Sequence, residues 1–220
     1  MLRSSFSSRT AVTLAAGWTA AALMAACASH RATINDTRYD LGPPLVATAG
    51  AMGAMGAMGA TPAAHALPPL KVLEVSAPSQ LDNDGIVYRL GADAQRTARY
   101  AQSRWTMPPA RLLTMRLRSA LGAHVTVLAG ADAVPAPRLA VELDQFEQVF
   151  ENATHSYGVL TARATLIGNG KAIAQHVFVI RAPAASPDAA GGVGALATAS
   201  DEFVEQIGAW LDGQRLAGRP

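Results

Sequence analysis

The sequence predicts an α+β fold, with a mixed, largely antiparallel β-sheet and two main helices packed on one of its faces. Two observations carry this expectation. Runs with strand composition outnumber the two segments with helical apolar spacing, and the last three of these runs follow one another directly. Consecutive strands with short connections pair as antiparallel hairpins, and a helix that follows them buries its apolar face on the sheet.

The first 26 residues have the layout of an export signal. Arg3 and Arg9 supply positive charge, residues 11–23 form an uncharged apolar run, and two small alanines close the segment. This run of 13 residues is shorter than the roughly 20 that a helix needs to cross a bilayer core. We therefore expect residues 1–26 to be a signal peptide that is removed.

Cys27 follows the sequence Leu23-Met24-Ala25-Ala26, which resembles the lipobox of bacterial lipoproteins. In that motif the thiol takes a diacylglyceryl group, a peptidase cuts before the modified cysteine, and the new amine accepts a third chain. Two or more acyl chains hold a protein stably on a membrane, whereas one chain is marginal. We expect covalent lipid on Cys27 and a lipidated tether over residues 27–36. The alternative is a chance cysteine after an ordinary signal.

Cys27 is the only cysteine in the chain, so the protein has no internal disulfide and its stability must come from packing. Ala28 follows the anchor in place of the Asp that tends to retain lipoproteins in the inner membrane of enteric bacteria. This favours an outer membrane lipoprotein whose domain faces the periplasm.

Removal of the signal leaves 194 of the 220 residues, enough for one domain with a sizeable core over residues 37–220. Arg3 and Arg9 leave with the signal, so 16 basic residues then balance 16 acidic ones, and the formal net charge falls from +2 to 0. A charge-balanced chain gives no indication of nucleic-acid binding.

Residues 45–69 consist mostly of Ala, Gly, Met and Pro and repeat the triplet Ala-Met-Gly over residues 51–59. Frequent glycine raises the entropic cost of ordering, and no long apolar stripe compensates for it. We expect a flexible insert within the domain. A Cu(I) site on the thioethers of Met52, Met55 and Met58 is the alternative, although slippage of a repeat in a tolerant loop explains the same pattern.

The first half of the domain contains short strand-like runs and one helix. Composition between turn signals predicts extended segments at residues 37–41, 70–75, 85–90 and 100–105. Pro108 and Pro109 fit the entry of a helix, where a missing N–H costs nothing. A leucine at every fourth position from 113 to 121 then marks one face, and Gly122 ends the helix.

The second half of the domain is dominated by three long strand-like runs. After a short run at residues 124–128, residues 139–181 predict a three-strand antiparallel meander with the hairpin signal Asn169-Gly170 between its last two strands. A loop follows at residues 183–192. Apolar positions from Val193 to Leu211 then have helical spacing and predict the second helix.

No catalytic or metal-binding constellation is present in the sequence. None of its five histidines lies three or four residues from another, and no HExxH, GxSxG or Walker pattern occurs; they are His30, His65, His124, His155 and His176. Gly191-Gly192-Val193-Gly194 precedes helical residues as phosphate loops do, but lacks their Lys and Ser/Thr. Close packing of small residues against the sheet explains it as well. We expect a protein that is not an enzyme and has no metal or cofactor apart from the lipid on Cys27.

Charge is segregated along the chain. Residues 89–118 contain seven arginines and one acid, and residues 132–151 contain five acids and one arginine. One interpretation is that the strands carrying these segments are neighbours and neutralise each other on a solvated face. The other is a pair of complementary surfaces on opposite sides of the domain, suited to a head-to-tail ring or to an acidic partner.

Several of these segments together resemble the ABC-type transport auxiliary lipoproteins of the PqiC/YmbA type. The most specific block is Tyr100 followed by Trp105 and the pair Pro108-Pro109. The lipobox, Tyr39-Asp40-Leu41, the run from Leu70 and the C-terminal Trp210-Leu211 fit the same family. The resemblance covers the chain after the signal apart from the Ala-Met-Gly insert.

The resemblance implies a mixed sheet with helices on one side and a role without catalysis. Its implied partners are an MCE-domain protein, an ABC permease and an ATPase, which move lipid between the two membranes. The lipoprotein would dock this assembly at the outer membrane, as a homo-oligomeric ring in one version. The alternatives are a periplasmic carrier that binds acyl chains, and an assembly lipoprotein of another envelope machine. Trp105 either packs against the helix after it or contacts a partner, and packing is the simpler interpretation.

Overall fold

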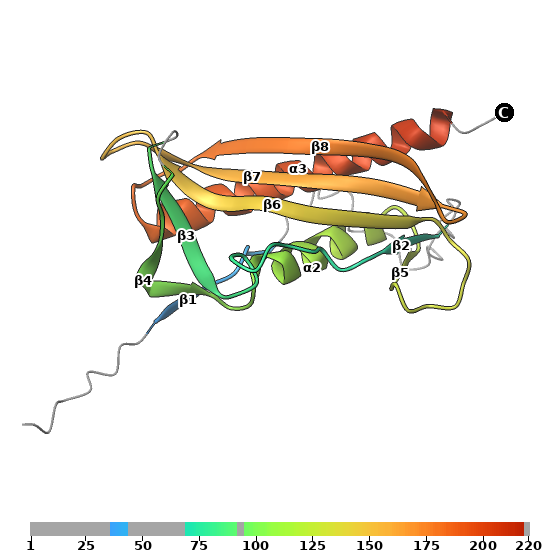
Figure 1. Cartoon of the computed structure of the whole chain (residues 1–220), viewed down its shortest axis with the longest axis horizontal. Coiled ribbons are helices and arrows are strands. Elements are labelled where there is room, and N and C mark those ends of the chain that lie inside the picture. Colours follow the sequence, from blue (N-terminus) through green and yellow to red (C-terminus); the bar gives the residue numbers. More distant parts are fainter. Residues whose placement is uncertain (1–35, 44–68, 92–94, 218–220) are drawn as a thin grey trace, which may run out of the picture. The chain divides into compact units, whose positions relative to one another are not determined.

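The computed structural model describes residues 36–43, 69–91 and 95–217. Cys27, the signal peptide, and nearly all of the tether 27–36 and of the insert 45–69 lie outside these residues. The described part confirms the α+β class. Its strands and helices are β1 Thr37–Tyr39, β2 Leu70–Val72, β3 Gly85–Leu90, β4 Thr97–Trp105, α2 Pro109–Gly122, β5 Val127–Leu128, β6 Arg138–Phe150, β7 Ser156–Gly168, β8 Lys171–Pro183 and α3 Ala189–Ala217 (Figure 1).

The eight strands form one mixed sheet. Its longest ladders are antiparallel: β7 pairs with β6 on one side and with β8 on the other, which confirms the expected meander. Asn169 and Gly170 both have positive φ, of 50° and 75°, which is why this pair can form the tight turn between β7 and β8. β6 pairs in parallel with β2 near its start and with β3 at its end.

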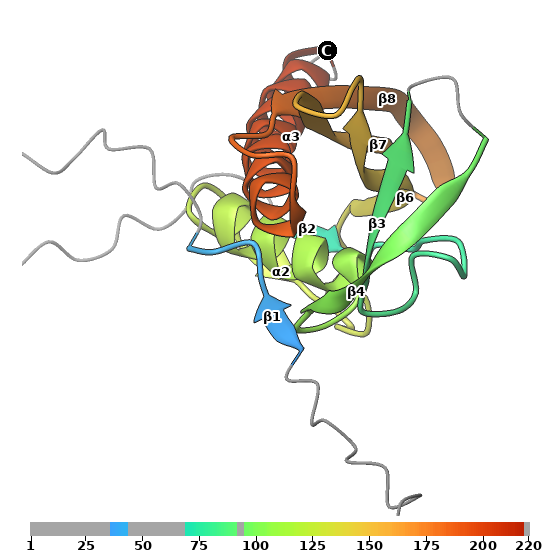
Figure 2. The same ribbon diagram turned by 90° about the vertical axis from the view of Figure 1, so that its left-hand side faces the viewer.

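Both helices lie on the concave side of the curled sheet (Figure 2). Alternate residues of the meander point toward them, so Leu160, Ala162 and Ala164 of β7 are fully buried. They belong to one core cluster with Leu196 and Phe203 of α3. The layer of helices on one face of the sheet therefore accounts for the core. No helix in the described ranges is long and apolar enough to cross a membrane.

Helix α2 begins as its prolines predict, with Pro108 as the N-cap and Pro109 in the first turn. Its buried face includes Leu113, Leu117 and Leu121, which confirms the predicted stripe. Thr114 lies on the same buried face, and its hydroxyl accepts a hydrogen bond of 2.9 Å from the N–H of Val75. This bond joins α2 to the segment after β2.

Arg116 of α2 is a buried cation, with 6% of its surface exposed. Its Nε lies 2.6 Å from Asp201 Oδ1 of α3, and its Nη1 donates to the carbonyl of Leu41 at 2.8 Å. A buried charge is tolerated only when it is paired and hydrogen-bonded, and Arg116 has both kinds of partner. It therefore fastens the chain after β1 to both helices.

Several element boundaries differ from the sequence predictions, among them the end of β1 at Tyr39 and the start of β4 at Thr97. Helix α3 starts at Ala189 and not at Val193, because the carboxylate of Asp188 accepts the N–H of Gly191 at 2.8 Å and caps the helix. β5 is only two residues long, since the N–H groups of His124 and Val125 donate to the carbonyl of Leu121 and hold these residues in a turn after α2. β2 ends at Val72, after which the chain follows β6 with irregular spacing.

Helix α3 packs closely against β7 at Gly158. A Cβ at this position would lie 2.8 Å from the backbone carbon of Ala195 and 2.8 Å from the nitrogen of Leu196. These are main-chain atoms of a packed helix and cannot rotate away. The missing side chain of Gly158 therefore sets the distance between helix and sheet.

We expect Gly158→Ala to lower the free energy of unfolding by about 1–3 kcal/mol, because the helix must shift to make room. Gly194→Ala is the matched control: it lies in α3 with nothing within 4 Å of a new Cβ and should raise stability by about 0.5–1 kcal/mol. Urea unfolding of both variants measures this difference. Equal stabilities would contradict the close approach.

Candidate functional site

Trp105, the most distinctive residue of the family-like block, lies in the core. It ends β4 with 1% of its surface exposed, and its ring centroid is 5.6 Å from that of Phe146 in β6. The backbone N–H of Trp105 donates to the carbonyl of Asp84 at 2.7 Å. A side chain so placed packs against other elements and offers no surface to a partner.

Tyr100 belongs to a chain of polar contacts that joins three strands. Its hydroxyl donates to Oε1 of Gln148 in β6 at 2.7 Å, and Nε2 of Gln148 donates to the hydroxyl of Ser156 in β7 at 2.8 Å. Gln148 is fully buried. Its amide is therefore satisfied at both ends only while Tyr100 is present.

Tyr100 stays neutral well above the usual range of a phenol. Burial, followed by the negative charge of Asp188 and the neighbouring Tyr88, raises the pKa of Tyr100 to about 12 from an ordinary 10.0. The N–H of Gly191 and the hydroxyl of Ser186 lower the pKa of Asp188, which keeps that carboxylate charged. The Tyr100 hydroxyl is thus a hydrogen-bond donor and not a base.

The four residues of the block do not form one site. Pro109 is buried in the first turn of α2 and Pro108 is half-buried before it, whereas Tyr100 points to Gln148 and Trp105 to Phe146. Each residue therefore has its own packing role. The block marks how β4 and α2 are joined to the sheet.

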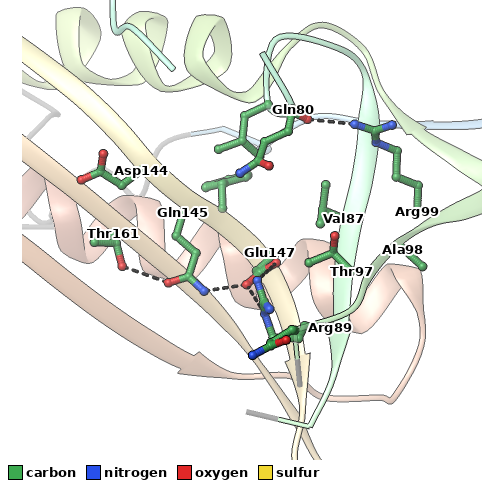
Figure 3. A pocket seen from close by; sticks show the side chains of 13 residues that line it. Gln80, Val87, Arg89, Thr97, Ala98, Arg99, Asp144, Gln145, Glu147 and Thr161 are labelled. Atoms are coloured by element: carbon green, nitrogen blue, oxygen red, sulfur yellow. Dashed lines mark hydrogen bonds and ion pairs between the residues drawn. The ribbon is translucent and has the colours of Figure 1, made fainter. Parts of the chain in front are cut away.

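A pocket of about 690 Å³ lies on the other face of the sheet, away from α3 (Figure 3). Thr161 lines it, and the two neighbours of Thr161 in β7, Leu160 and Ala162, are buried on the helix side. Side chains of β3, β4 and β6 complete the wall, with Gln80 above them. No sequence pattern singled out this pocket.

The floor of the pocket is a connected polar network. Thr161 donates to Gln145 at 3.2 Å, Gln145 donates to Glu147 at 2.6 Å, and Nε of Arg89 lies 2.8 Å from Glu147 Oε1. The Glu147 side chain is only 4% exposed. Because its charge is compensated by Arg89, the network stabilises the contact between β3 and β6 and presents no free nucleophile or base.

Arg89 and Glu147 come from the arginine-rich and the acidic segment, respectively. Their contact follows from the parallel pairing of β3 with β6, as the neutralisation interpretation requires. Other arginines of the same segment find different partners: Arg104 lies 3.7 Å from Asp36, and Arg116 binds Asp201. Of the ion pairs described here, Arg89–Glu147 joins the arginine-rich segment to the acidic segment. Arg104 and Arg116 pair with acids outside the acidic segment.

Metal ligands do not gather in the described part of the chain, where no three His, Cys, Asp or Glu side chains lie together. His155 is held in the β6–β7 turn by Asn152 and Thr154. His176 of β8 lies with its ring 6.5 Å from Trp210 of α3. The first set of contacts consists of hydrogen bonds within a turn, and the second is packing between β8 and α3.

We expect Trp105→Ala to lower the free energy of unfolding by about 3–5 kcal/mol, since it empties a large volume in the core. Trp105→Phe should cost much less because it keeps an aromatic ring against Phe146. Thermal and urea unfolding give both values. A Trp105→Ala protein of normal stability would show that the side chain serves a partner instead.

We expect stability to fall as the pH rises from 10 to about 12, because the unfolded chain ionises Tyr100 there and the folded chain does not. Below that window this group contributes no pH dependence. Tyr100→Phe should remove its share of the slope and cost about 1–3 kcal/mol at neutral pH, since Gln148 loses its donor. Asp188→Asn should lower the pKa of Tyr100 in a spectrophotometric titration, whereas the exposed Asp144→Asn should not.

Two solved structures share the fold. Protein XCC0632 from Xanthomonas campestris, assigned to the DUF330 family, is 20% identical with a TM-score of 0.62, and the match covers 72% of this chain and 94% of that one. An uncharacterized protein is 16% identical with a TM-score of 0.62, covering 80% of this chain and 99% of that one. No curated protein matches the sequence.

A sequence profile described as the ABC-type transport auxiliary lipoprotein component matches residues 52–208. This range includes every described element from β2 to most of α3, and leaves Cys27 and β1 outside. The match spans more than half of the chain. Membership of this family associates the protein with the cell envelope and with a transport system. The chain belongs to the ABC-type transport auxiliary lipoprotein family.

Proposed function

We propose that this protein is a non-catalytic docking subunit of an MCE-type ABC lipid transport system, anchored to the outer membrane and facing the periplasm. The observation that carries the proposal is the family match over residues 52–208. Its partners would be the MCE-domain protein together with its permease and ATPase. The protein would act through its position at the membrane, and the complete pairing of the buried polar side-chain atoms in the described residues supports this role.

The proposed anchor is lipid on Cys27, and the described fold supports a short connection to it. β1 begins at Thr37 and pairs in parallel with β4, and Arg38 binds Asp84 at 2.8 Å. An extended chain covers at most about 3.3–3.6 Å per residue, so the nine steps from Cys27 to Asp36 reach about 30 Å. Such a tether would keep the domain next to the membrane surface.

The pocket on the helix-free face argues against the alternative of an acyl-chain carrier. Its lining includes Arg89, Arg99, Asp144 and Glu147, and charged groups disfavour a hydrocarbon chain. The large buried apolar residues of the core pack against one another beneath the helices. The charged pocket and the filled core therefore favour a docking role over a role in which the protein carries lipid inside its fold.

We expect Cys27→Ser to leave the fold intact, to release the protein from the membrane fraction and to abolish transport. The physical reason is that two or three acyl chains supply the whole membrane affinity. Cell fractionation, circular dichroism and a lipid-transport assay measure the three outcomes, with Ser29→Ala as the control beside the modified residue. Normal transport by a freely soluble Cys27→Ser protein would refute the docking role. Failure of the wild type to co-purify with the MCE-domain protein would also count against it.

A further inference from the structure

The pocket on the helix-free face lies where β6 has a neighbouring strand on one side only. β6 is bridged in parallel to Ser76 at Glu142, and its ladder with β3 begins at Gln148. Between these two positions, no described strand pairs with β6 on the side opposite β7. Side chains of residues 144–147 line the pocket at this gap. The pocket therefore arises where β3 separates from β6.

A β-bulge in β6 turns two consecutive polar side chains toward this pocket. The β6–β7 register shifts between Leu143 and Gln145, which leaves Asp144 without an opposite residue in β7. Leu143 before the bulge and Phe146 after it are both buried in the core. Asp144 and Gln145 therefore both line the pocket, where regular alternation would send one of them into the core. Asp144 is exposed, and the described residues offer its carboxylate no hydrogen-bond or ion-pair partner.

Arg99 of β4 supplies a cation on the opposite side of the pocket (Figure 3). Its side chain crosses Gly85 of β3 so closely that a Cβ on Gly85 would collide with Cδ of Arg99. Its Nη2 donates to the carbonyl of Gln80 at 3.0 Å, which holds the guanidinium in place. Within the described ranges this guanidinium has no further partner, so its other N–H groups are available to a ligand.

The charges that line the pocket balance one another. Arg89 and Glu147 form an ion pair in the floor. Asp144 and Arg99 are not paired with each other and face the pocket from opposite sides (Figure 3). Complementary charges favour the ligand that neutralises both of them. The pocket therefore suits a ligand that carries one charge of each sign and disfavours a multiply charged anion.

We propose that this pocket binds a small zwitterion in which an ammonium group and a phosphate are separated by a short chain, as in phosphoethanolamine. The ammonium pairs with the carboxylate of Asp144. The phosphate pairs with the guanidinium of Arg99, whose planar fork of N–H groups matches phosphate oxygens. The two charges must be separated because Asp144 and Arg99 lie on opposite sides of the pocket, and an α-amino acid carries both charges on one carbon.

Two sources can present this chemistry. One is the head group of a phospholipid, whose acyl chains stay outside because charged groups disfavour a hydrocarbon chain in the pocket. This source rests on the proposed function, which holds the domain beside a membrane. The other source is a soluble phosphodiester. Binding of the zwitterion does not require the docking role, so the two proposals can fail separately.

The test uses the full mature chain carrying Cys27→Ser, with glycerophosphoethanolamine as the probe. Isothermal titration calorimetry should show saturable binding, and glycerophosphoglycerol, which has the phosphodiester but no ammonium, should bind about tenfold more weakly. Asp144→Asn should remove this preference, and Arg99→Gln should weaken the binding of both probes by about tenfold or more. Arg111→Gln and Glu205→Gln remove exposed charges on α2 and α3, away from the pocket, and should leave binding unchanged.

Several results would overturn the proposal. They are the absence of saturable binding of glycerophosphoethanolamine, equal binding of the two probes, and binding that neither pocket variant weakens in a protein whose circular dichroism shows the normal fold. Co-sedimentation with vesicles of equal parts phosphatidylethanolamine and phosphatidylglycerol separates the two sources. Sedimentation that Asp144→Asn reduces supports a lipid head group, and binding of the soluble probe without sedimentation supports a soluble phosphodiester.

Discussion

The contact between helix α3 and the meander β6–β7–β8 determines the rest of the structure. The main chain of the helix passes within van der Waals distance of Gly158, and Gly192 faces the buried Gln148 from the helix side. Small residues at this crossing let the larger ones beyond it, such as Phe178 and Phe203 with ring centroids 5.3 Å apart, interlock. The core of the described domain is therefore built outward from a crossing where side chains are absent.

This crossing also explains where polar groups are buried. Gln148 lies under the start of α3, so its amide can be satisfied only by Tyr100 from β4 and Ser156 from β7. Asp188 caps the helix at the same end, and its charge helps to keep Tyr100 neutral. The local order of three strands and one helix end therefore depends on one small set of hydrogen bonds.

The two faces of the sheet have different physical characters. The helix side holds the apolar core, whereas the other side carries the Arg89–Glu147 pair in a polar pocket and the exposed valines of β8. Within the described ranges, every buried polar side-chain atom has a hydrogen-bond partner. The two faces therefore differ mainly in what they present to solvent.

The sequence by itself determined the elements and the class of fold, because these depend on local signals. Asn169-Gly170 specified the hairpin, and the leucines from 113 to 121 specified the buried face of α2. The predicted start of α3 lies four residues too far along the chain, because a glycine-rich stretch is typical of a loop and the cap from Asp188 is not evident from the sequence. The sequence favoured packing for Trp105, and its burial in the structure confirms it. Tertiary structure alone decided that Arg89 meets Glu147 and that β8 lies at an edge of the described sheet. These features depend on which strands become neighbours. Pairing between segments that are distant in the sequence produces no periodic pattern, so the sequence could not predict it.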